Sequence, residues 1–560
     1  MFQSIRQFSA CDGGRFAREF LPRVAVLLVS GAAALLATGA DLRAQIIAPR
    51  PVPEAAADAI TASDISEHIE FLASDEMMGR DTPGPWLDSA ARYIENAFRE
   101  YGVEPVNGSY YHEYSLKRED LGTPNTLKVN GRESRLKDDF IPYEFSASGS
   151  ASGDVVFVGY GISRPDLGYD DYAGIDVRGK VVIAISGAPP RFTPKRPGAE
   201  SLAEQGPRDK MRVAVRHGAV GLLLLQSPAR NRFVRPGGYS WRALYPGLAA
   251  SSIPVKLDLP STETAIPAAG IGIEIAQRLF GKDIQTIGEM VKKMDSMGAP
   301  ASRSLNAQVN MEVTIQKTII PARNVVGVVR GARFPDEYVV IGAHYDHIGY
   351  FNAPSDAPTS EREDIDTVYN GADDNASGTS ALLLNARAFG SLPAAQRPAR
   401  SILFIAFSGE EKGLYGSRAY ITQPSVPAEG MKAMLNMDMI GRNHRDSVSV
   451  AGGSCSAQLA AMVVEANRAE PMTLVYDLED MLHRSDQASF MSRSIPVVFL
   501  SAGQHDDYHR VTDEIERINK KKVAHIARLC FRIAWLAAES PQPPAWDTGA
   551  QPTSLQHFPD

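Results

Sequence analysis

The sequence has few cysteines, no excess of basic charge and, beyond residue 44, no long apolar run. Its 3 cysteines among 560 residues, Cys11, Cys455 and Cys530, are too few for a fold built on disulfides. Cys11 lies upstream of an early apolar run, and the sequence does not show whether Cys455 and Cys530 meet. Lys and Arg number 58 against 66 Asp and Glu, for a net charge of -8, so we expect no nucleic-acid partner.

The first residues have the layout of a signal peptide. An arginine-bearing start leads into the apolar run Val24 to Ala37, and the small residues Ala40 and Ala44 offer cleavage points. The run is short for a membrane span, which needs about 20 residues. We therefore expect residues 1–44 to direct export to the periplasm or the medium and to leave no stable membrane span after cleavage. An uncleaved N-terminal anchor is the alternative.

The remaining chain is too long for one ordinary core, because single cores stop growing at roughly 250 to 300 residues. Its 44% hydrophobic and 22% charged residues are typical of a soluble globular protein. Apolar spacings of three and four between Ser63 and Tyr101 predict two helices, and short β-rich stretches follow from about 123 to 310. From Asn324 onward strands alternate with helices, which indicates an α/β domain with a largely parallel sheet.

In this last region the patterns predict strands over 338–343, 401–407, 434–439 and 495–500 and helices over 377–389, 456–468 and 520–538. Polar residues follow several of the strands. His344 and Asp346 come directly after the first one, where open α/β sheets bind ligands. His344 can bind a metal while Asp346 supports its imidazole, although a plain polar loop would also explain the pair.

Two pairs of acidic residues precede helices. Asp373 and Asp374 can cap the following helix, or one of them can bridge two cations while the other serves structure. Glu410 and Glu411 can be a solvated helix start, or one can bind a metal while the other takes a proton from water as a general base.

Asp438 lies among apolar residues of the predicted strand 434–439, and burying a carboxylate is costly unless it is paired or bound to metal. After the last strand come two histidines, His505 and His509, either of which can complete a site. Together these positions offer His, Asp, Glu, Asp and His, a set of N and O ligands that suits zinc better than calcium. Coincidence at every position is improbable.

The chain is similar to the co-catalytic dizinc exopeptidase family, which includes bacterial leucyl-type aminopeptidases and glutamate carboxypeptidases. The motifs that carry this resemblance are Gly342–Asp346, Gly371–Asn375, Ser408–Glu411, Asn436–Asp438 and Asp507–His509. One departure is Gln487, which stands where the family often has histidine.

The resemblance implies two zinc ions per chain and a role for each residue. Asp374 bridges the ions and Asp373 is structural, His344 and Asp438 hold one ion, and Glu411 and His509 hold the other. Glu410 is the base that takes a proton from the attacking water and delivers it to the leaving amine, and Asp346 stands behind His344. His509 is preferred to His505 because it follows a tyrosine and precedes Asp513 at the family's spacing, whereas the role of His505 stays open.

The fold implied is that of a zinc exopeptidase: a mostly parallel mixed sheet flanked by helices, interrupted by a β-rich insert that resembles a protease-associated (PA) domain. The expected parts are a signal peptide (1–44), a linker (45–62), N-terminal helices (63–118), the PA insert (119–311), the dizinc peptidase domain (312–540) and a flexible tail (541–560).

For function, the resemblance implies an exported zinc aminopeptidase acting on peptides. A carboxypeptidase of the same fold is the alternative and would need cationic groups near the site. A glutaminyl cyclase is less expected because of the insert, and a non-catalytic receptor-like protein is less expected because every ligand and the base are present. Side-chain preference and oligomeric state do not follow from the sequence.

Overall fold

A computed structural model describes residues 49–192, 206–229, 234–241, 243–244, 254–259, 263–351, 365–547 and 549. The expected signal peptide 1–44 lies outside the described residues, as do 45–48 of the expected linker and most of the expected tail. Within the described residues, no helix is both long and apolar enough to cross a membrane.

The N-terminal part is helical. Helices α1 (Glu54–Asp58), α2 (Ala62–Leu72) and α3 (Pro85–Glu100) and the 3-10 turn η1 (Asp75–Arg80) precede the first strand. The Thr61 hydroxyl accepts a hydrogen bond from Asp64 N at the start of α2, and Pro85 opens α3, where its missing N–H costs nothing. The two helices predicted between Ser63 and Tyr101 are confirmed.

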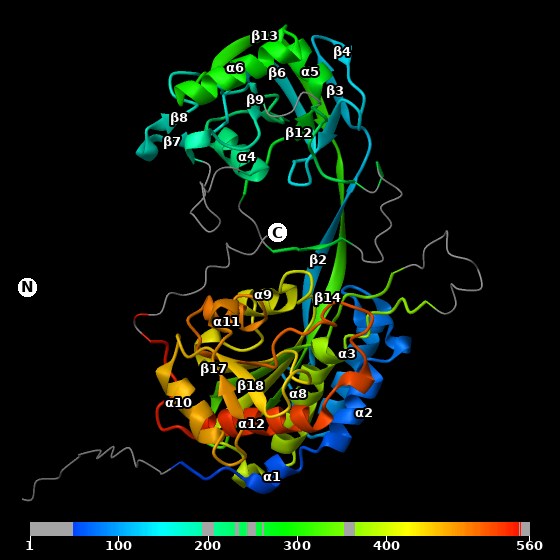
Figure 1. The fold of residues 1–560 in the computed structure, drawn as a ribbon, viewed down its shortest axis with the longest axis vertical. Coiled ribbons are helices and arrows are strands. Elements are labelled where there is room, and N and C mark those ends of the chain that lie inside the picture. The colour runs from blue at the N-terminus through cyan, green and yellow to red at the C-terminus, as the bar shows by residue number, and fades with distance from the viewer. Residues whose placement is uncertain are drawn as a thin grey trace, which may run out of the picture. The chain divides into compact units, whose positions relative to one another are not determined.

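Besides these helices, the protein contains a ten-stranded mixed sheet (Figure 1). Its order is β11-β2-β14-β16-β15-β17-β20-β18-β19, with β1 paired to β14. The strands are β1 (Glu104–Pro105), β2 (Tyr111–Leu121), β11 (Lys256–Leu257), β14 (Ile315–Val329), β15 (Phe334–His344), β16 (Arg400–Phe407), β17 (Met431–Met437), β18 (Ser447–Ala451), β19 (Thr473–Val475) and β20 (Val497–Ser501). The central strands β16, β15, β17 and β20 run parallel, as predicted. In contrast, β14 pairs antiparallel with β16 and β2, and β18 pairs antiparallel with β20.

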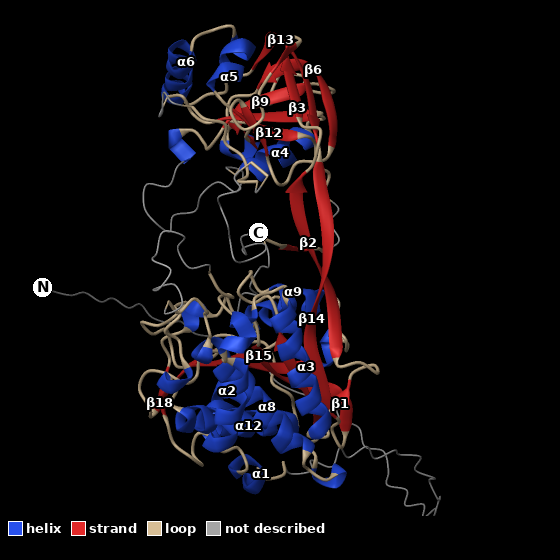
Figure 2. Ribbon diagram, turned by 90° about the vertical axis from the view of Figure 1, so that its right-hand side faces the viewer, coloured by secondary structure: helices blue, strands red, loops and turns tan. Residues whose placement is uncertain are grey.

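Helices cover both faces of this sheet because its central strands are apolar on both sides. Val339 and Ile341 of β15 belong to the core packed by α2, α3, α8, α10 and α12, and Val340 belongs to the core packed by α9 and α11. Figure 2 shows α2, α8 and α12 together on one face. The bounds of these helices are α8 (Gly378–Gly390), α9 (Tyr415–Thr422), α10 (Ala457–Ala466), α11 (Gln487–Met491) and α12 (Lys520–Glu539).

A second, eight-stranded sheet has the order β4-β3-β13-β6-β9-β10-β12-β5 and a core of its own. Its strands are β3 (Thr126–Val129), β4 (Arg132–Glu133), β5 (Phe140–Pro142), β6 (Gly149–Phe157), β9 (Val181–Ile185), β10 (Gly221–Leu225), β12 (Ala268–Ile271) and β13 (Arg303–Val313). Helices α4 (Pro207–Arg216), α5 (Ile273–Phe280) and α6 (Ile284–Met297) and the hairpin β7 (Ser163–Arg164) and β8 (Tyr169–Asp170) accompany it.

Two details differ from the sequence-based picture or complete it. Strand β17 ends at Met437, so Asp438 follows the strand instead of lying inside the predicted span 434–439. Cys455 and Cys530 are both buried and unpaired, so the described residues contain no disulfide.

Candidate metal centre

The candidate site lies where the parallel strands of the ten-stranded sheet end. Because β15 runs parallel to β16 and β17, and β17 to β20, the carboxyl ends of these strands meet at one edge. His344 is the last residue of β15, and Asp438 directly follows β17. Asp374 comes from the turn η4 (Ala372–Ser377), which leads into α8.

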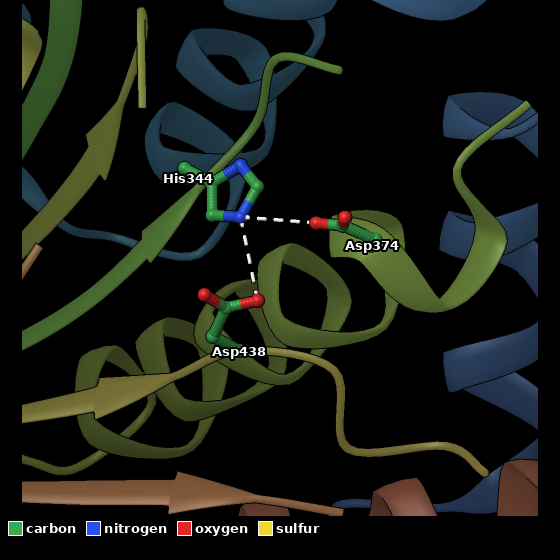
Figure 3. Close-up of side chains that lie close together, drawn as sticks. All are labelled: His344, Asp374 and Asp438. Atoms are coloured by element: carbon green, nitrogen blue, oxygen red, sulfur yellow. Dashed lines mark hydrogen bonds and ion pairs between the residues drawn. The ribbon is translucent and has the colours of Figure 1, made fainter. Parts of the chain in front are cut away.

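One group of ligands forms around His344. Its Nε2 lies 3.3 Å from Asp374 Oδ1 and 3.4 Å from Asp438 Oδ1. Figure 3 shows the three side chains pointing toward a common centre from the end of a strand, a helical turn and the loop after a second strand. The His344 side chain is only 1% exposed, so this group is closed to solvent on the histidine side.

A second group forms around His509. Its Nε2 lies 3.2 Å from Asp374 Oδ2 and 3.1 Å from Glu411 Oε2. Asp374 therefore presents one carboxylate oxygen to each group, as expected of a bridging ligand. The five predicted metal ligands, His344, Asp374, Glu411, Asp438 and His509, come together in the structure.

These spacings fit zinc. Ligand atoms around a tetrahedral zinc with bonds of about 2.0–2.1 Å lie about 3.3 Å apart, close to all four distances above. His509 Nε2 is buried and has no partner with hydrogen-bond geometry within the described part of the chain, although two carboxylates lie beside it. A nitrogen placed in this way is available for a metal.

His347 is a functional candidate that sequence reasoning missed. His347 lies close enough to Asp374 and Glu411 for the three to form a further group that could hold a metal ion. However, its Nδ1 lies 2.7 Å from Glu411 Oε1, which is a hydrogen-bond distance shorter than the spacing between zinc ligands. His347 therefore fixes one oxygen of Glu411 while the other faces His509. Strand alternation would have turned residue 347 away from residues 344 and 346, but β15 ends at His344 and the alternation ends with it.

Asp346 is buried behind His344 but contacts it only in part. His344 Nδ1 lies 3.2 Å from the main-chain oxygen of Asp346 and 3.7 Å from its carboxylate Oδ1. The carboxylate instead accepts hydrogen bonds from Glu410 N at 3.2 Å and from the Thr82 hydroxyl at 3.0 Å. Asp346 thus connects the loop after β15 to the loop after β16.

Asp373 and His505 pair with each other outside the two ligand groups. Asp373 Oδ1 accepts a hydrogen bond from Gly441 N at 2.6 Å, and its Oδ2 lies 3.3 Å from His505 Nε2. Asp513 accepts the main-chain N–H groups of Asp373 and Asp374, each at 3.0 Å, and so holds the turn that carries the bridging carboxylate.

Gln487, the departure from the family pattern, is fully buried and bridges two elements. Its Oε1 accepts from Asn436 Nδ2 at 2.8 Å, and its Nε2 donates to the Leu482 carbonyl at 2.9 Å. The amide therefore supports the end of β17 beside Asp438.

The crowded charges shift several pKa values in opposite directions. Burial lowers the pKa of His344, but the charges of Asp438 and Glu410 outweigh it and leave that pKa well above its usual range. Burial also lowers the pKa of His509, but hydrogen bonds with Asp374 and Glu411 outweigh it and raise that pKa to about 10. Burial, together with the charges of Glu411 and Asp438, raises the pKa of Glu410 well above its usual range. These surroundings favour the protonated form of the Glu410 carboxyl in the metal-free protein.

A cavity opens beside the two ligand groups. Its lining combines carboxylates, apolar side chains and a few polar ones: Asp374, Glu410, Glu411, Asp438, Met439, Leu478, Met481, Arg484, Ser485, Phe499, Ser501, Gly503, Gln504 and Tyr508. Arg484 thus lines the cavity, whereas Arg442 is engaged with Asp507 at 2.6 Å.

Fold and site together define an α/β domain with a candidate metal centre at the carboxyl edge of its sheet. Among protein families, the model of Peptidase family M28 matches residues 324–534 of this chain. Among curated proteins, Transferrin receptor protein 2 of Rattus norvegicus is 25% identical over 379 residues, 63% of this chain and 42% of that protein. The Glutamate carboxypeptidase 2 homolog of Caenorhabditis elegans is 24% identical over 459 residues, 70% of this chain and 53% of that protein.

This chain therefore spans about half or less of the length of these two curated relatives. Among solved structures, an aminopeptidase from Aneurinibacillus sp. strain AM-1 is 20% identical and aligns with a TM-score of 0.45 over 87% of this chain and 96% of that one.

Proposed function

We propose that the protein is a zinc-dependent aminopeptidase with two zinc ions per chain. His344 and Asp438 would hold one ion, Glu411 and His509 the other, and Asp374 both. The observation that carries this proposal is that two histidine–carboxylate groups share the two oxygens of Asp374 at zinc-like spacings beside an open cavity.

When bound, zinc lowers the pKa of a coordinated water to about 7 and polarises a peptide carbonyl. The protein's own contribution to proton transfer would be Glu410, which lines the cavity and is not among the proposed ligands. Its main-chain N–H donates to Asp346 Oδ1, which fixes the loop that carries it. Glu410 would take a proton from the attacking water and return it to the leaving amine.

The aminopeptidase hypothesis is favoured by Glu410, a carboxylate residue of the lining that lies outside the proposed ligand set. A free amino terminus is a cation that would pair with this carboxylate, while Met439, Leu478 and other apolar residues would receive its side chain. Arg484 is the feature that favours the alternative, because it lines the same cavity and offers a cation to a terminal carboxylate.

A non-catalytic role is the other alternative, since one curated relative is named a transferrin receptor. It would require a defective centre, whereas this chain keeps the complete ligand set and a candidate base.

We further propose that residues 119–311 form a PA-type insert that restricts access to the cavity or helps to orient peptides, and that residues 1–44 direct export to the periplasm or the medium.

The decisive experiment measures hydrolysis of aminoacyl reporters and of peptides with free or blocked carboxyl ends by purified protein. Each substrate is tested as purified, after chelation and after zinc restoration. We expect chelation to abolish cleavage of the first peptide bond and zinc to restore it. Cleavage only of substrates with a free carboxyl terminus would establish the carboxypeptidase instead, and zinc binding without hydrolysis of any substrate would favour the receptor-like role.

A further inference from the structure

Three buried or half-buried residues at the end of η1, Arg80, Asp81 and Thr82, contact the end of β15, the turn that carries Asp374 and the loop of Glu410 and Glu411. They lie outside the segment 324–534 that matches the peptidase family. Asp81 Oδ1 pairs with Lys412 Nζ at 2.7 Å, next to Glu411 in the chain. Arg80 and Thr82, which are both completely buried, reach deeper.

Among the residues that the structure describes, the Arg80 guanidinium donates only to main-chain carbonyls. Its partners are the carbonyls of Leu72, Tyr345 at 3.0 Å, Asn370 at 2.8 Å and Gly371 at 3.1 Å. Tyr345 directly follows His344, and Asn370 and Gly371 lead into the turn that carries Asp374. One rigid, planar group therefore joins the end of β15 to the start of that turn.

A buried cation without a paired carboxylate is costly unless its surroundings supply negative charge. Here Asp346, Asp374, Asp513 and Glu411 supply it: burial lowers the pKa of Arg80 to about 10 although these four charges oppose the shift. Arg80 therefore remains charged at neutral pH inside an otherwise acidic centre.

Thr82 joins the loop after β15 to the loop after β16. Its hydroxyl donates to Asp346 Oδ2 at 3.0 Å and accepts from Gly409 N at 3.0 Å. The second oxygen of the same Asp346 carboxylate accepts from Glu410 N at 3.2 Å. One hydroxyl and one carboxylate thus fix the main-chain N–H groups of Gly409 and of Glu410, the candidate base.

We propose that Arg80 and Thr82 are positioning residues for the metal centre, Arg80 by fixing the turn of Asp374 against the end of β15 and Thr82 by fixing Asp346 and the loop of Glu410. This inference rests on the proposed function, but zinc binding tests it separately from hydrolysis.

The first test compares Thr82→Val, which keeps the shape and removes the hydroxyl, with Thr82→Ser, which keeps the hydroxyl. Loss of a group that supports a metal centre typically lowers activity or metal affinity by about 10- to 100-fold. We expect Thr82→Val to lower kcat by about 10-fold or more with KM nearly unchanged, and Thr82→Ser to restore most of it. Equal kcat and equal zinc affinity in Thr82→Val and the unaltered protein would overturn the role of Thr82.

The second test measures zinc affinity of metal-free protein by competition with a chromogenic chelator. Arg80→Lys keeps the charge but loses the planar fork, so we expect zinc affinity to fall by about 10-fold or more. The matched control is Arg400→Lys, because Arg400 is also buried and donates to the carbonyls of Ala538 and Ser540, away from the site. We expect it to keep zinc affinity within about 2-fold.

Equal affinities in Arg80→Lys and the unaltered protein, or equal losses in Arg80→Lys and Arg400→Lys, would overturn the role of Arg80. If Arg80→Lys does not fold, the comparison at Thr82 decides. Failure of the unaltered protein to bind zinc would instead contradict the proposed function itself.

Discussion

At the scale of single residues, Glu410 and Glu411 are neighbours in the chain but have opposite surroundings. Burial and the charge of Asp374 raise the pKa of Glu411, yet hydrogen bonds with His347 and His509 outweigh them and leave it lowered. The pKa of Glu410 is raised by burial and by the negative charges around it. The two directions agree with the proposed roles of Glu411 as a ligand and of Glu410 as a proton carrier.

Glu410→Gln should separate these roles. Because the amide cannot accept the proton, we expect kcat to fall by about 100- to 10,000-fold while the zinc content stays that of the unaltered protein. Steady-state kinetics and metal analysis of the same preparation check both parts. The matched variant Glu411→Gln should lose zinc as well as activity, and full hydrolysis by a zinc-loaded Glu410→Gln protein would rule out Glu410 as the base.

His68 lies far from the residues of the metal centre in the sequence, and its surroundings predict how stability depends on pH. It is 6% exposed, with Nδ1 2.7 Å from the Tyr93 hydroxyl and Nε2 3.2 Å from that of Tyr101. Burial, assisted by the charge of Arg387, lowers the pKa of His68 from 6.5 to about 4. The unfolded chain therefore binds a proton more readily between these values, so stability is complete above pH 6.5 and falls as the pH drops toward 4.

Between pH 7 and pH 5, His68 alone should lower the free energy of unfolding by about 2 kcal/mol. Urea denaturation at both pH values measures it, and His68→Gln should show a smaller pH dependence by that amount. The same pH dependence in both proteins would mean that His68 is not held neutral.

At the scale of elements, apolar patterns in the sequence predicted the strands and helices around the site, but they did not predict the turns between them. The strand ends that carry His344, Glu411 and Asp438 were predictable because buried parallel strands read as continuous apolar runs. The role of His347 was not, because it depends on where β15 ends and on a contact with a different loop. Likewise, Gln487 differs from the family pattern in sequence, but its bridge to Asn436 exists only in the fold.

The turn η4 shows how such an element is held. Asp513 accepts hydrogen bonds from the main-chain N–H groups of Asp373 and Asp374. Asp513→Asn replaces one of the two accepting oxygens by an NH2 group, which cannot accept a hydrogen bond. We therefore expect the free energy of unfolding to fall by about 1–3 kcal/mol. Zinc affinity should fall too, because the turn carries Asp374. Denaturation and zinc titration measure the two effects, with the exposed Asp506→Asn in the same loop as the control. Identical zinc affinity in Asp513→Asn and the control would show that the turn needs no such support.

At the scale of the whole molecule, the centre draws on segments that lie far apart in the sequence. Thr82 meets Gly409, and Asp373 and Asp374 meet Asp513, although the sequence between them builds other strands and helices. Alternation of strands and helices predicts the sheet, but no local pattern predicts which distant turn supports it. A metal bound at such a centre should therefore stabilise the whole fold, because it joins these segments.

This coupling gives a prediction for stability as a function of zinc. A ligand that binds only the folded state at 100 times its Kd adds about 2.7 kcal/mol per site. If Asp374 bridges two ions, Asp438→Ala should keep about half of the zinc-dependent stabilisation, because the group of Glu411 and His509 remains. Asp374→Ala should lose almost all of it, because both groups lose an oxygen. Urea denaturation over a series of buffered free-zinc concentrations measures each contribution. Equal losses in the two variants would contradict the bridging role of Asp374 and indicate a single metal site.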